Sequence, residues 1–118
     1  IAKWEKSCGK HPTQKPLCVL ARIILASTKP GAWILDPFTG SSTTGIAANL
    51  LDRRFLGIDQ ESEFLHISKA RKIEIEDSVK RAEYISKLQK QATIYSETKA
   101  KTNIVADTLS DYCCELPF

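Results

Sequence analysis

Two aspartates and a glycine-bearing loop form the most suggestive arrangement in this sequence. Asp36 ends the apolar run 32–35, Asp59 ends the run 55–58, and Gly40 lies in the loop that follows Asp36. A glycine-bearing loop between a strand and a helix is typical of nucleotide binding. Phosphate-binding forms do not fit, because the sequence has neither Gly-Lys-Ser/Thr nor Gly-x-Gly-x-x-Gly. In addition, a carboxylate ~4 Å from a pyrophosphate would repel it by about 4 kcal/mol per charge pair, at an effective dielectric constant of about 20.

The same residues suit a ligand that carries positive charge. S-adenosylmethionine has a sulfonium and an ammonium group and no phosphate, so Asp36 would attract its methionine end while Gly40 lets the backbone approach closely. Asp59 would accept hydrogen bonds from both ribose hydroxyls, at the carboxyl ends of the strands where open α/β sheets bind ligands. Purely structural roles stay open. Asp36 and Asp59 would then be turn or capping residues. Gly40 would form a tight turn, Gly45 would serve packing, and residues 41–44 would cap the next helix.

The order of elements around these residues predicts a βαβ unit. Residues 1–16 form an irregular loop, and apolar residues at 17, 20, 21, 24 and 25 predict an amphipathic helix that ends at 29–31. A buried strand is predicted at 32–36 and a second strand at 55–59, with a helix at 43–51 between them. Such a strand–helix–strand order indicates parallel pairing.

A long polar helix is predicted from Ser62 to about residue 92. Phe64, Ile67 and Ala70 mark one face of it, and Arg71 belongs to its run of basic residues. The sequence determines little about the segment 93–118.

The composition is that of an ordinary globular protein. The 118 residues include 17 Lys and Arg against 14 Asp and Glu, a net charge of +3. No apolar run approaches the ~18–20 residues of a membrane span, so no membrane association is expected. The basic excess lies in residues 1–35, with six basic side chains and one acidic, and forms either a solvated surface or a strip that faces phosphate.

The cysteines and the missing methionine add two expectations. None of the four cysteines has metal-ligand spacing, so we expect no metal site and free thiols in a reducing cytoplasm. The absence of Met, even at residue 1, predicts that the chain is a fragment.

Three segments closely resemble the C-terminal part of bacterial DNA amino-methyltransferases of restriction–modification systems, which are adenine- or N4-cytosine-specific. They are His-Pro-Thr-Gln-Lys-Pro at 11–16, Asp-Pro-Phe-Thr-Gly-Ser-Ser-Thr-Thr-Gly at 36–45 and Arg-Phe-Leu-Gly-Ile-Asp at 54–59. The resemblance covers about residues 10–72. It implies an α/β fold that is part of a Rossmann-like S-adenosylmethionine-dependent methyltransferase, with a parallel sheet flanked by helices. The domain division that follows is a basic loop at 1–16 leading into the pocket, a cofactor-binding α/β region at 17–92 and a C-terminal tail at 93–118.

The resemblance also implies which residues bind S-adenosylmethionine, and it places no catalytic or metal-binding residue in this chain. The residues at the methionine end are Thr13, Gln14, Lys15 and Pro16. Those of the cofactor loop are Asp36, Pro37, Phe38, Gly40 and Ser41. The residues that bind the ribose and the adenine edge of the cofactor are Asp59 and Gln60.

The sequence departs from the family pattern in two places. Gly40-Ser41-Ser42 replaces the commoner Gly-x-Gly, so we expect a slightly less open loop. The Asp/Asn/Ser-Pro-Pro-aromatic tetrapeptide, which holds the flipped target base in the resembling family, does not occur in these 118 residues. In the subgroup whose cofactor motifs come last, that tetrapeptide precedes the segment equivalent to 11–16. We therefore expect a cofactor-binding half that transfers no methyl group alone.

The intact enzyme is expected to methylate an exocyclic amine of a flipped base in double-stranded DNA, adenine in preference to cytosine. Its partners would be DNA and the N-terminal catalytic half or a complementing chain, with a homodimer as a further expectation. Its place would be the bacterial cytoplasm, at the nucleoid. Two alternatives remain open: a non-catalytic subunit or remnant that binds a partner carrying the missing motif, and a methyltransferase of RNA or a small molecule.

Overall fold

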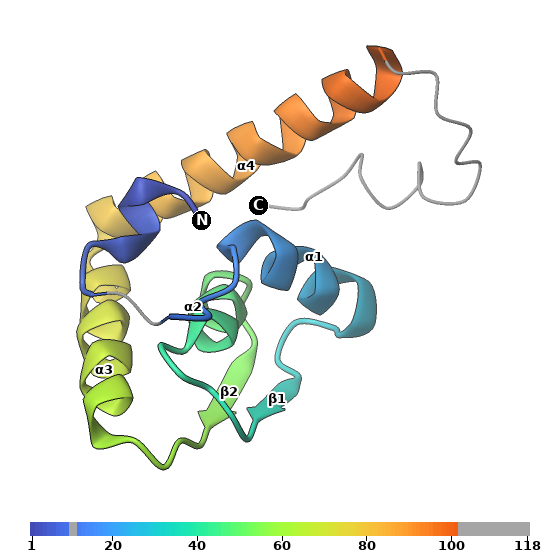
Figure 1. The fold of residues 1–118 in the computed structure, drawn as a ribbon. Coiled ribbons are helices and arrows are strands. Elements are labelled where there is room, and N and C mark those ends of the chain that lie inside the picture. The colour runs from blue at the N-terminus through green and yellow to red at the C-terminus, as the bar shows by residue number, and fades with distance from the viewer. Residues whose placement is uncertain (10–11, 102–118) are drawn as a thin grey trace.

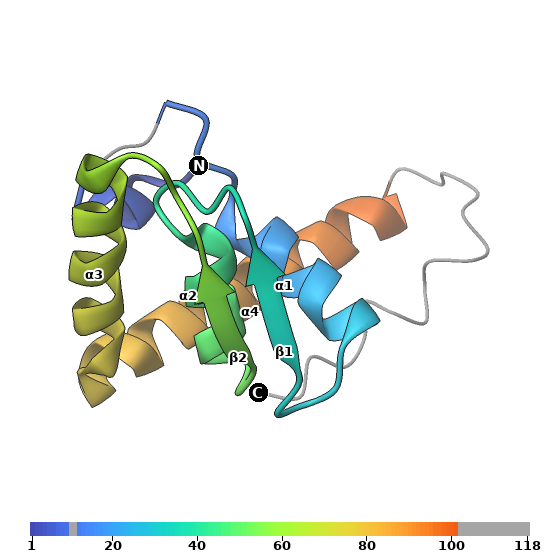
Figure 2. The ribbon, with the colours of Figure 1, turned by 90° about the horizontal axis from the view of Figure 1, so that it is seen from below.

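The protein is built around two short parallel strands, with all described helices on one side of them (Figures 1 and 2). The computed structural model describes residues 1–9 and 12–101, with side chains to residue 92. The strands are β1 (Trp33–Asp36) and β2 (Arg54–Gly57), and they pair in parallel with Asp36 opposite Gly57. Helix α2 (Thr43–Leu50) connects them, which confirms the predicted βαβ unit.

A close approach between α2 and β2 explains the glycine in the first turn of that helix. A Cβ atom at Gly45 would lie 2.5 Å from the ring of Phe55, far inside an ordinary contact. A Cβ atom at Gly57 would lie 2.7 Å from the same ring. The packing role that the sequence left open for Gly45 is therefore confirmed.

The hydrophobic core lies between the helices rather than between two layers of a large sheet. Helix α1 (Leu17–Ser27) packs its predicted apolar stripe on α2, which is made of small and aliphatic residues. The buried core consists of Leu17, Ala21, Ile24, Ile46, Ala47, Ala48, Leu50, Leu51, Ile75, Tyr84 and Leu88.

The single helix predicted from Ser62 to about residue 92 is two helices, α3 (Ser62–Glu76) and α4 (Ser78–Lys101). Asp77 separates them with an extended backbone, and its Oδ1 accepts the N–H groups of Val79 and Lys80 at 2.8 and 3.0 Å. An aspartate in this position caps a new helix, so the chain turns there, as Figure 1 shows. The tail predicted at 93–118 begins inside α4, and residues 102–118 lie outside the described residues.

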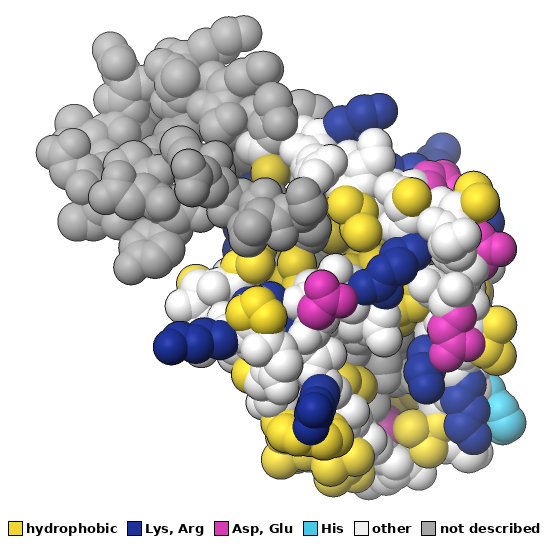
Figure 3. All heavy atoms as spheres, turned by 180° about the vertical axis from the view of Figure 1, so that it is seen from behind, with side chains coloured by type: hydrophobic (Ala, Val, Ile, Leu, Met, Phe, Trp, Pro, Cys, Tyr) yellow, Lys and Arg dark blue, Asp and Glu magenta, His cyan; other side chains and the backbone are white. Residues whose placement is uncertain are grey.

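The prediction that the strand at 32–36 is buried is wrong for one of its faces. Ile34 and Phe55 pack against the core, whereas Trp33 and Leu35 are 67% and 61% exposed and Leu56 is 56% exposed. In Figure 2 the strands lie in front of the helices, and no helix of the described chain covers them from outside. Hydrophobic side chains also gather at the lower end of the molecule in Figure 3, the end where Figure 1 places the strands. We call Trp33, Leu35, Leu56 and Ile58 the outer sheet face.

Within the described part of the chain, no helix is long and apolar enough to cross a membrane, and no three His, Cys, Asp or Glu side chains are placed to hold a metal ion.

Candidate functional site

The loop between β1 and α2 lies at the carboxyl ends of both strands, where the sequence predicted a ligand site. The Ile58 N–H donates to the carbonyl of Asp36 at 2.9 Å, and the Thr39 N–H donates to the carbonyl of Ile58 at 3.0 Å. These bonds extend the strand pairing past its last residues. They bring the segments that carry Asp36 and Asp59 together.

Asp36 closes the loop onto helix α2. Its Oδ1 accepts the Phe38 N–H at 3.1 Å, and its Oδ2 accepts the Thr44 hydroxyl at 2.7 Å. The turn role that the sequence left open for Asp36 is therefore present. The carboxylate remains partly exposed near the N-terminus of α2, where negative charge is favourable.

Asp59 binds the same loop from the neighbouring strand. Its Oδ2 accepts the Gly40 N–H at 2.8 Å, and its Oδ1 accepts the Glu61 N–H at 2.9 Å, just before α3 begins. Asp59 thus positions the loop and shapes the start of α3, although the N-cap position is Glu61. A carboxylate offers about four acceptor positions, so these bonds are compatible with contacts to a ligand.

The loop backbone takes an uncommon conformation at two residues. Gly40 has φ 53° and Ser42 has φ 55°, both left-handed. Gly40 adopts this conformation freely, whereas Ser42, which stands where the resembling family commonly has glycine, is strained. The Ser42 hydroxyl shares a hydrogen bond with the Thr39 hydroxyl at 2.9 Å and makes no side-chain cap for α2.

Gln14 connects the segment 12–16 to the loop. Its Oε1 accepts the Ser41 hydroxyl at 3.2 Å, and its Nε2 donates to the carbonyl of Glu5 at 3.0 Å. Glu5 lies in the short helix η1 (Lys3–Lys6), and its Oε2 accepts the Leu17 N–H at 2.9 Å. Glu5 therefore takes the capping role for α1 that Pro16, the N-cap residue, does not fill with its own side chain.

The predicted cofactor residues divide into a connected group and an exposed rim. Gln14, Asp36, Gly40, Ser41 and Asp59 are joined through the loop by the bonds above. The exposed members of the set are Thr13, Lys15, Pro37, Phe38 and Gln60, and Pro16 is half-buried. Phe38 is 88% exposed at the tip of the loop, an unusual position for an aromatic ring. His11 lies outside the described residues.

Sequence reasoning missed Arg71, which it counted with the basic residues of a polar helix. The side chain is only 2% exposed, and its Nη1 donates to the carbonyl of Ser41 at 2.7 Å, to the Ser41 hydroxyl at 3.3 Å and to the Thr43 hydroxyl at 3.0 Å. Burial lowers the pKa of Arg71. Helical spacing was the available signal, because Ser68, Arg71 and Ile75 share one face of α3.

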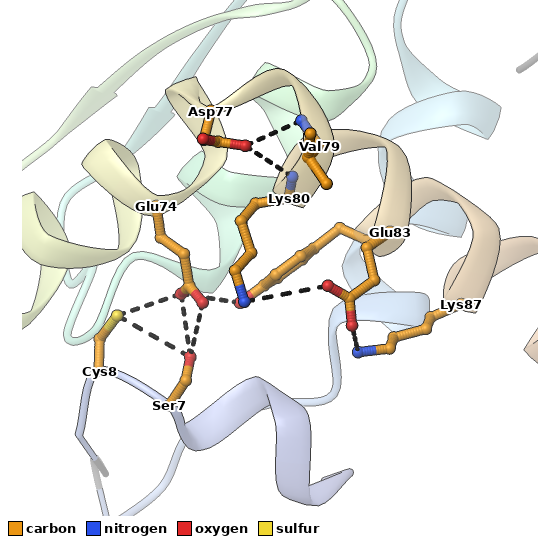
Figure 4. A network of polar contacts seen from close by, with 9 residues as sticks. Ser7, Cys8, Glu74, Asp77, Val79, Lys80, Glu83 and Lys87 are labelled. Atoms are coloured by element: carbon orange, nitrogen blue, oxygen red, sulfur yellow. Dashed lines mark hydrogen bonds and ion pairs between the residues drawn. The ribbon is translucent and has the colours of Figure 1, made fainter.

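A second cluster anchors the N-terminal segment to α3 and α4. Figure 4 shows Ser7 and Cys8 directed toward Glu74; the Ser7 hydroxyl donates to its Oε2 at 2.9 Å and the Cys8 thiol at 3.1 Å. The Tyr84 hydroxyl donates to the same oxygen at 3.0 Å. Burial raises the pKa of Glu74, but these three hydrogen bonds outweigh it and hold the pKa below its usual value.

The thiol and the phenol of this cluster stay protonated. Burial, together with the bond to Glu74, raises the pKa of Cys8, and burial chiefly raises the pKa of Tyr84 to about 12. Cys8 is therefore a hydrogen-bond donor here and not an activated nucleophile.

Comparison with known proteins gives a family match. A family model described as DNA methylase matches residues 1–70. Among curated proteins, the Type II methyltransferase M2.MboI of Moraxella bovis is 57% identical over 91 residues, which are 77% of this chain and 33% of the relative. The Type II methyltransferase M2.DpnII of Streptococcus pneumoniae is 64% identical over 69 residues, 58% of this chain and 26% of that relative.

The fold has a match among solved structures. The crystal structure of the M1.HpyAVI–SAM complex superposes with a TM-score of 0.56 at 46% sequence identity, over 59% of this chain and 33% of that one. The likeness confirms the predicted α/β, Rossmann-like architecture. The chain thus spans about a third of the length of the relatives it matches.

Proposed function

The chain belongs to the DNA methylase family, and we propose that it forms the S-adenosylmethionine-binding portion of a DNA amino-methyltransferase. The enzyme it belongs to would methylate an exocyclic base amine in double-stranded DNA, with adenine preferred over cytosine. The observation that carries this proposal is the loop at the carboxyl ends of β1 and β2, held between two carboxylates through Thr44 and Gly40.

The residues of this loop fit the chemistry of the cofactor. S-adenosylmethionine supplies an electrophilic methyl group on a sulfonium centre. Asp36 and Asp59 provide negative charge next to the loop, which favours a cationic ligand and disfavours a phosphate. The left-handed backbone at Gly40 turns the chain without a side chain at that point, so a ligand can approach the backbone.

We assign each group of residues a part in holding the cofactor. Residues 13–16 would contact its methionine end, with Gln14 fixed to the loop through Ser41. Asp59 with Gln60 would bind the ribose and adenine edge. Phe38, exposed at the loop tip, would cover one side of the ligand and exclude water from it. Catalysis would then rest on placing the reactive methyl group and on the electrostatics of the site.

The outer sheet face is the surface on which we place the rest of the enzyme. Parallel sheets in α/β proteins are covered on both faces, whereas Trp33, Leu35, Leu56 and Ile58 are each more than half exposed here. The relatives are about three times as long as their matching parts, so their remaining residues are sufficient to form the missing layer. The occupant we propose is this remaining, catalytic portion, on the same chain or on a complementing one.

A pair of variants tests this surface. The 118-residue chain is mixed with the part of M2.MboI that lies outside the matched residues, and complex formation is followed by size-exclusion chromatography. Leu35→Asp should abolish the complex, whereas Ile73→Asp, which changes an equally exposed apolar residue on α3, should leave it intact. Self-association of the chain through the outer sheet face would instead identify a homodimer and overturn this assignment.

The chain alone would transfer no methyl group to DNA, because it lacks the tetrapeptide that holds the target base. Its basic residues in 1–35 would give salt-sensitive, nonspecific DNA affinity. We place the enzyme in the bacterial cytoplasm at the nucleoid, because its proposed substrate is DNA. The assay mixes the purified chain with duplex DNA and methyl-labelled cofactor and measures the label transferred to the DNA. Label in the DNA above that of a heat-killed control would refute this proposal.

Cofactor binding itself is tested by titrating the chain with S-adenosylmethionine. We expect Asp59→Asn to weaken binding about tenfold, since a charged acceptor contributes roughly 1.5–3 kcal/mol. Glu63→Gln is the matched control, because Glu63 is an exposed acid in the first turn of α3. Equal affinity of the Asp59 variant and the wild type would refute the ribose assignment.

A further inference from the structure

Arg71 is buried beneath the cofactor loop and is a charged hydrogen-bond donor to it. Its Nη1 lies within hydrogen-bond distance of both oxygens of Ser41 and of the Thr43 hydroxyl. We propose that Arg71 is a positioning residue that holds this loop in the conformation that binds the cofactor. This inference rests on the function proposed above, and it gives Arg71 no contact with the cofactor itself.

The loop needs such support because its backbone is strained. Ser41 lies between Gly40 and Ser42, which both have a left-handed backbone, and Ser42 carries a Cβ atom that disfavours this conformation. Strained residues persist where the surrounding structure over-determines them. The bond from Arg71 to the Ser41 carbonyl fixes the peptide between the two left-handed residues.

Other groups hold the same loop from other sides. The Ser68 hydroxyl, one turn before Arg71 on α3, donates to the Gly40 carbonyl at 2.9 Å. Asp59 accepts the Gly40 N–H, and Gln14 accepts the Ser41 hydroxyl. Arg71, like Asp59, makes charge-assisted hydrogen bonds, which are stronger than those between neutral groups. Arg71 differs from Asp59 because it is buried and reaches both the Ser41 carbonyl and the Thr43 hydroxyl, so its loss should affect the loop strongly.

The burial of Arg71 supports a role beyond packing. Burying a guanidinium is unfavourable, and an apolar residue often serves equally well where only packing is needed. Burial lowers the pKa of Arg71, and the negative charges of the buried Glu5 and of Glu74 oppose this effect. The Nη2 atom of Arg71 and the Oε1 atom of Glu5 are buried without a hydrogen-bond partner among the described residues. The Nη1 atom, which has its hydrogen-bond partners, is thus the part of the guanidinium that contacts the loop.

Arg81 provides a matched control at the other end of α2. Its Nη1 donates to the Asn49 side chain at 2.6 Å and its Nη2 to the Asn49 carbonyl at 2.8 Å, at the C-terminal end of that helix. Arg71→Met and Arg81→Met therefore each remove an arginine that ties α2 to a neighbouring helix or loop. Only the first acts on the end of α2 that carries the cofactor loop.

The experiment measures binding of S-adenosylmethionine to the full 118-residue chain by NMR titration, with amide hydrogen exchange at Gly40 as a second readout. We expect Arg71→Met to weaken binding about tenfold and to accelerate exchange at Gly40. Arg71→Lys keeps the positive charge and serves as the second variant in case Arg71→Met does not fold. Its affinity and its exchange rate at Gly40 should lie between those of Arg71→Met and the wild type. Arg81→Met should lower the melting temperature and leave both readouts at the wild-type level.

The possible outcomes separate this inference from the proposed function. Wild-type affinity in both Arg71 variants would overturn the positioning role while leaving cofactor binding intact. Equal weakening in Arg71→Met and Arg81→Met would also overturn it, because the effect would then be one of general stability. A wild-type chain that binds no S-adenosylmethionine would overturn the proposed function, and this inference with it.

Discussion

Replacing Gly45 by alanine tests the packing that sets α2 against the sheet. In an ordinary helix this change stabilises the protein by about 1 kcal/mol, because alanine has the higher helix propensity. Here the added Cβ atom would lie 2.5 and 2.6 Å from two ring carbons of Phe55. Carbon atoms in contact prefer a separation of about 3.5–4.0 Å, so the ring or the helix must move by about 1 Å.

The ring of Phe55 has little room to move. A Cβ atom at Gly57 would lie 2.7 Å from the same ring carbon, so the backbone of β2 also borders the ring closely. Forcing extra atoms into a packed core costs about 1–3 kcal/mol, and this site belongs at the upper end of that range. Subtracting the helix-propensity gain leaves a net loss of about 1–2 kcal/mol in the free energy of unfolding.

Urea denaturation of wild type, Gly45→Ala, Phe55→Leu and the double variant measures this effect. We expect Gly45→Ala to destabilise the wild type, and to be neutral or stabilising by up to about 1 kcal/mol in the Phe55→Leu background, where the ring is gone. A Gly45→Ala protein as stable as the wild type would refute the packing argument. So would an equal loss in both backgrounds.

Three further predictions concern the loop and the N-terminal cluster. Asp36→Asn should weaken the binding of S-adenosylmethionine more than the binding of neutral adenosine, because the charge of Asp36 acts on the cationic methionine end. Equal losses of affinity for the two ligands in titrations would show that Asp36 is a structural turn residue alone. Ser42→Gly should change the unfolding free energy by no more than about 0.5 kcal/mol, because the relief of backbone strain is offset by the lost bond to Thr39 and by the backbone entropy of glycine. Ser42→Val should cost about 2 kcal/mol, because a β-branched residue fits the left-handed backbone poorly. The free energy of unfolding should fall between pH 10 and 12, since the pKa of Tyr84 is raised to about 12 and the unfolded chain loses its proton first. It should also fall on acidification below the ordinary pKa of a glutamate, because the pKa of Glu74 is lowered in the folded protein. In pH-dependent denaturation, Tyr84→Phe should reduce the alkaline slope to the part that the raised pKa of Cys8 contributes. It should also make the acidic slope shallower, because Glu74 loses one of its three hydrogen bonds.

The strand–loop–helix–strand unit was predictable because local patterns determine it. Apolar runs that end on aspartates, a glycine between them and a stripe of small residues each encode a nearby structure. The structure confirms the parallel pairing and the helices α1 and α2. The position of Asp59 near the loop also followed, since parallel strands end at one edge of the sheet.

The contacts of Arg71 and Glu5 were not predictable from local patterns. Both residues are charged, and their types favour the surface, yet both are buried by elements distant in sequence. Arg71 contacts Ser41, thirty residues earlier, and Glu5 reaches the start of α1. Only the packing of α3 against the loop and of η1 against the start of α1 creates these contacts. The break at Asp77 is different, because an Asp-Ser pair inside a helical pattern is itself a capping signal.

The outer sheet face explains why the predicted burial of the strand at 32–36 was right for one of its faces and wrong for the other. A short run of apolar residues indicates that a strand is buried in the whole folded protein. It does not indicate which other part of the protein covers the strand. Ile34 and Phe55 pack against the core within this chain, while Trp33 and Leu35 are 67% and 61% exposed. The strands therefore carry the composition of buried, two-sided strands although only one side is covered here. This mismatch is the physical argument for our proposal that a further layer of protein covers the outer sheet face. The absence of the base-binding tetrapeptide from these 118 residues supports the same proposal from chemistry.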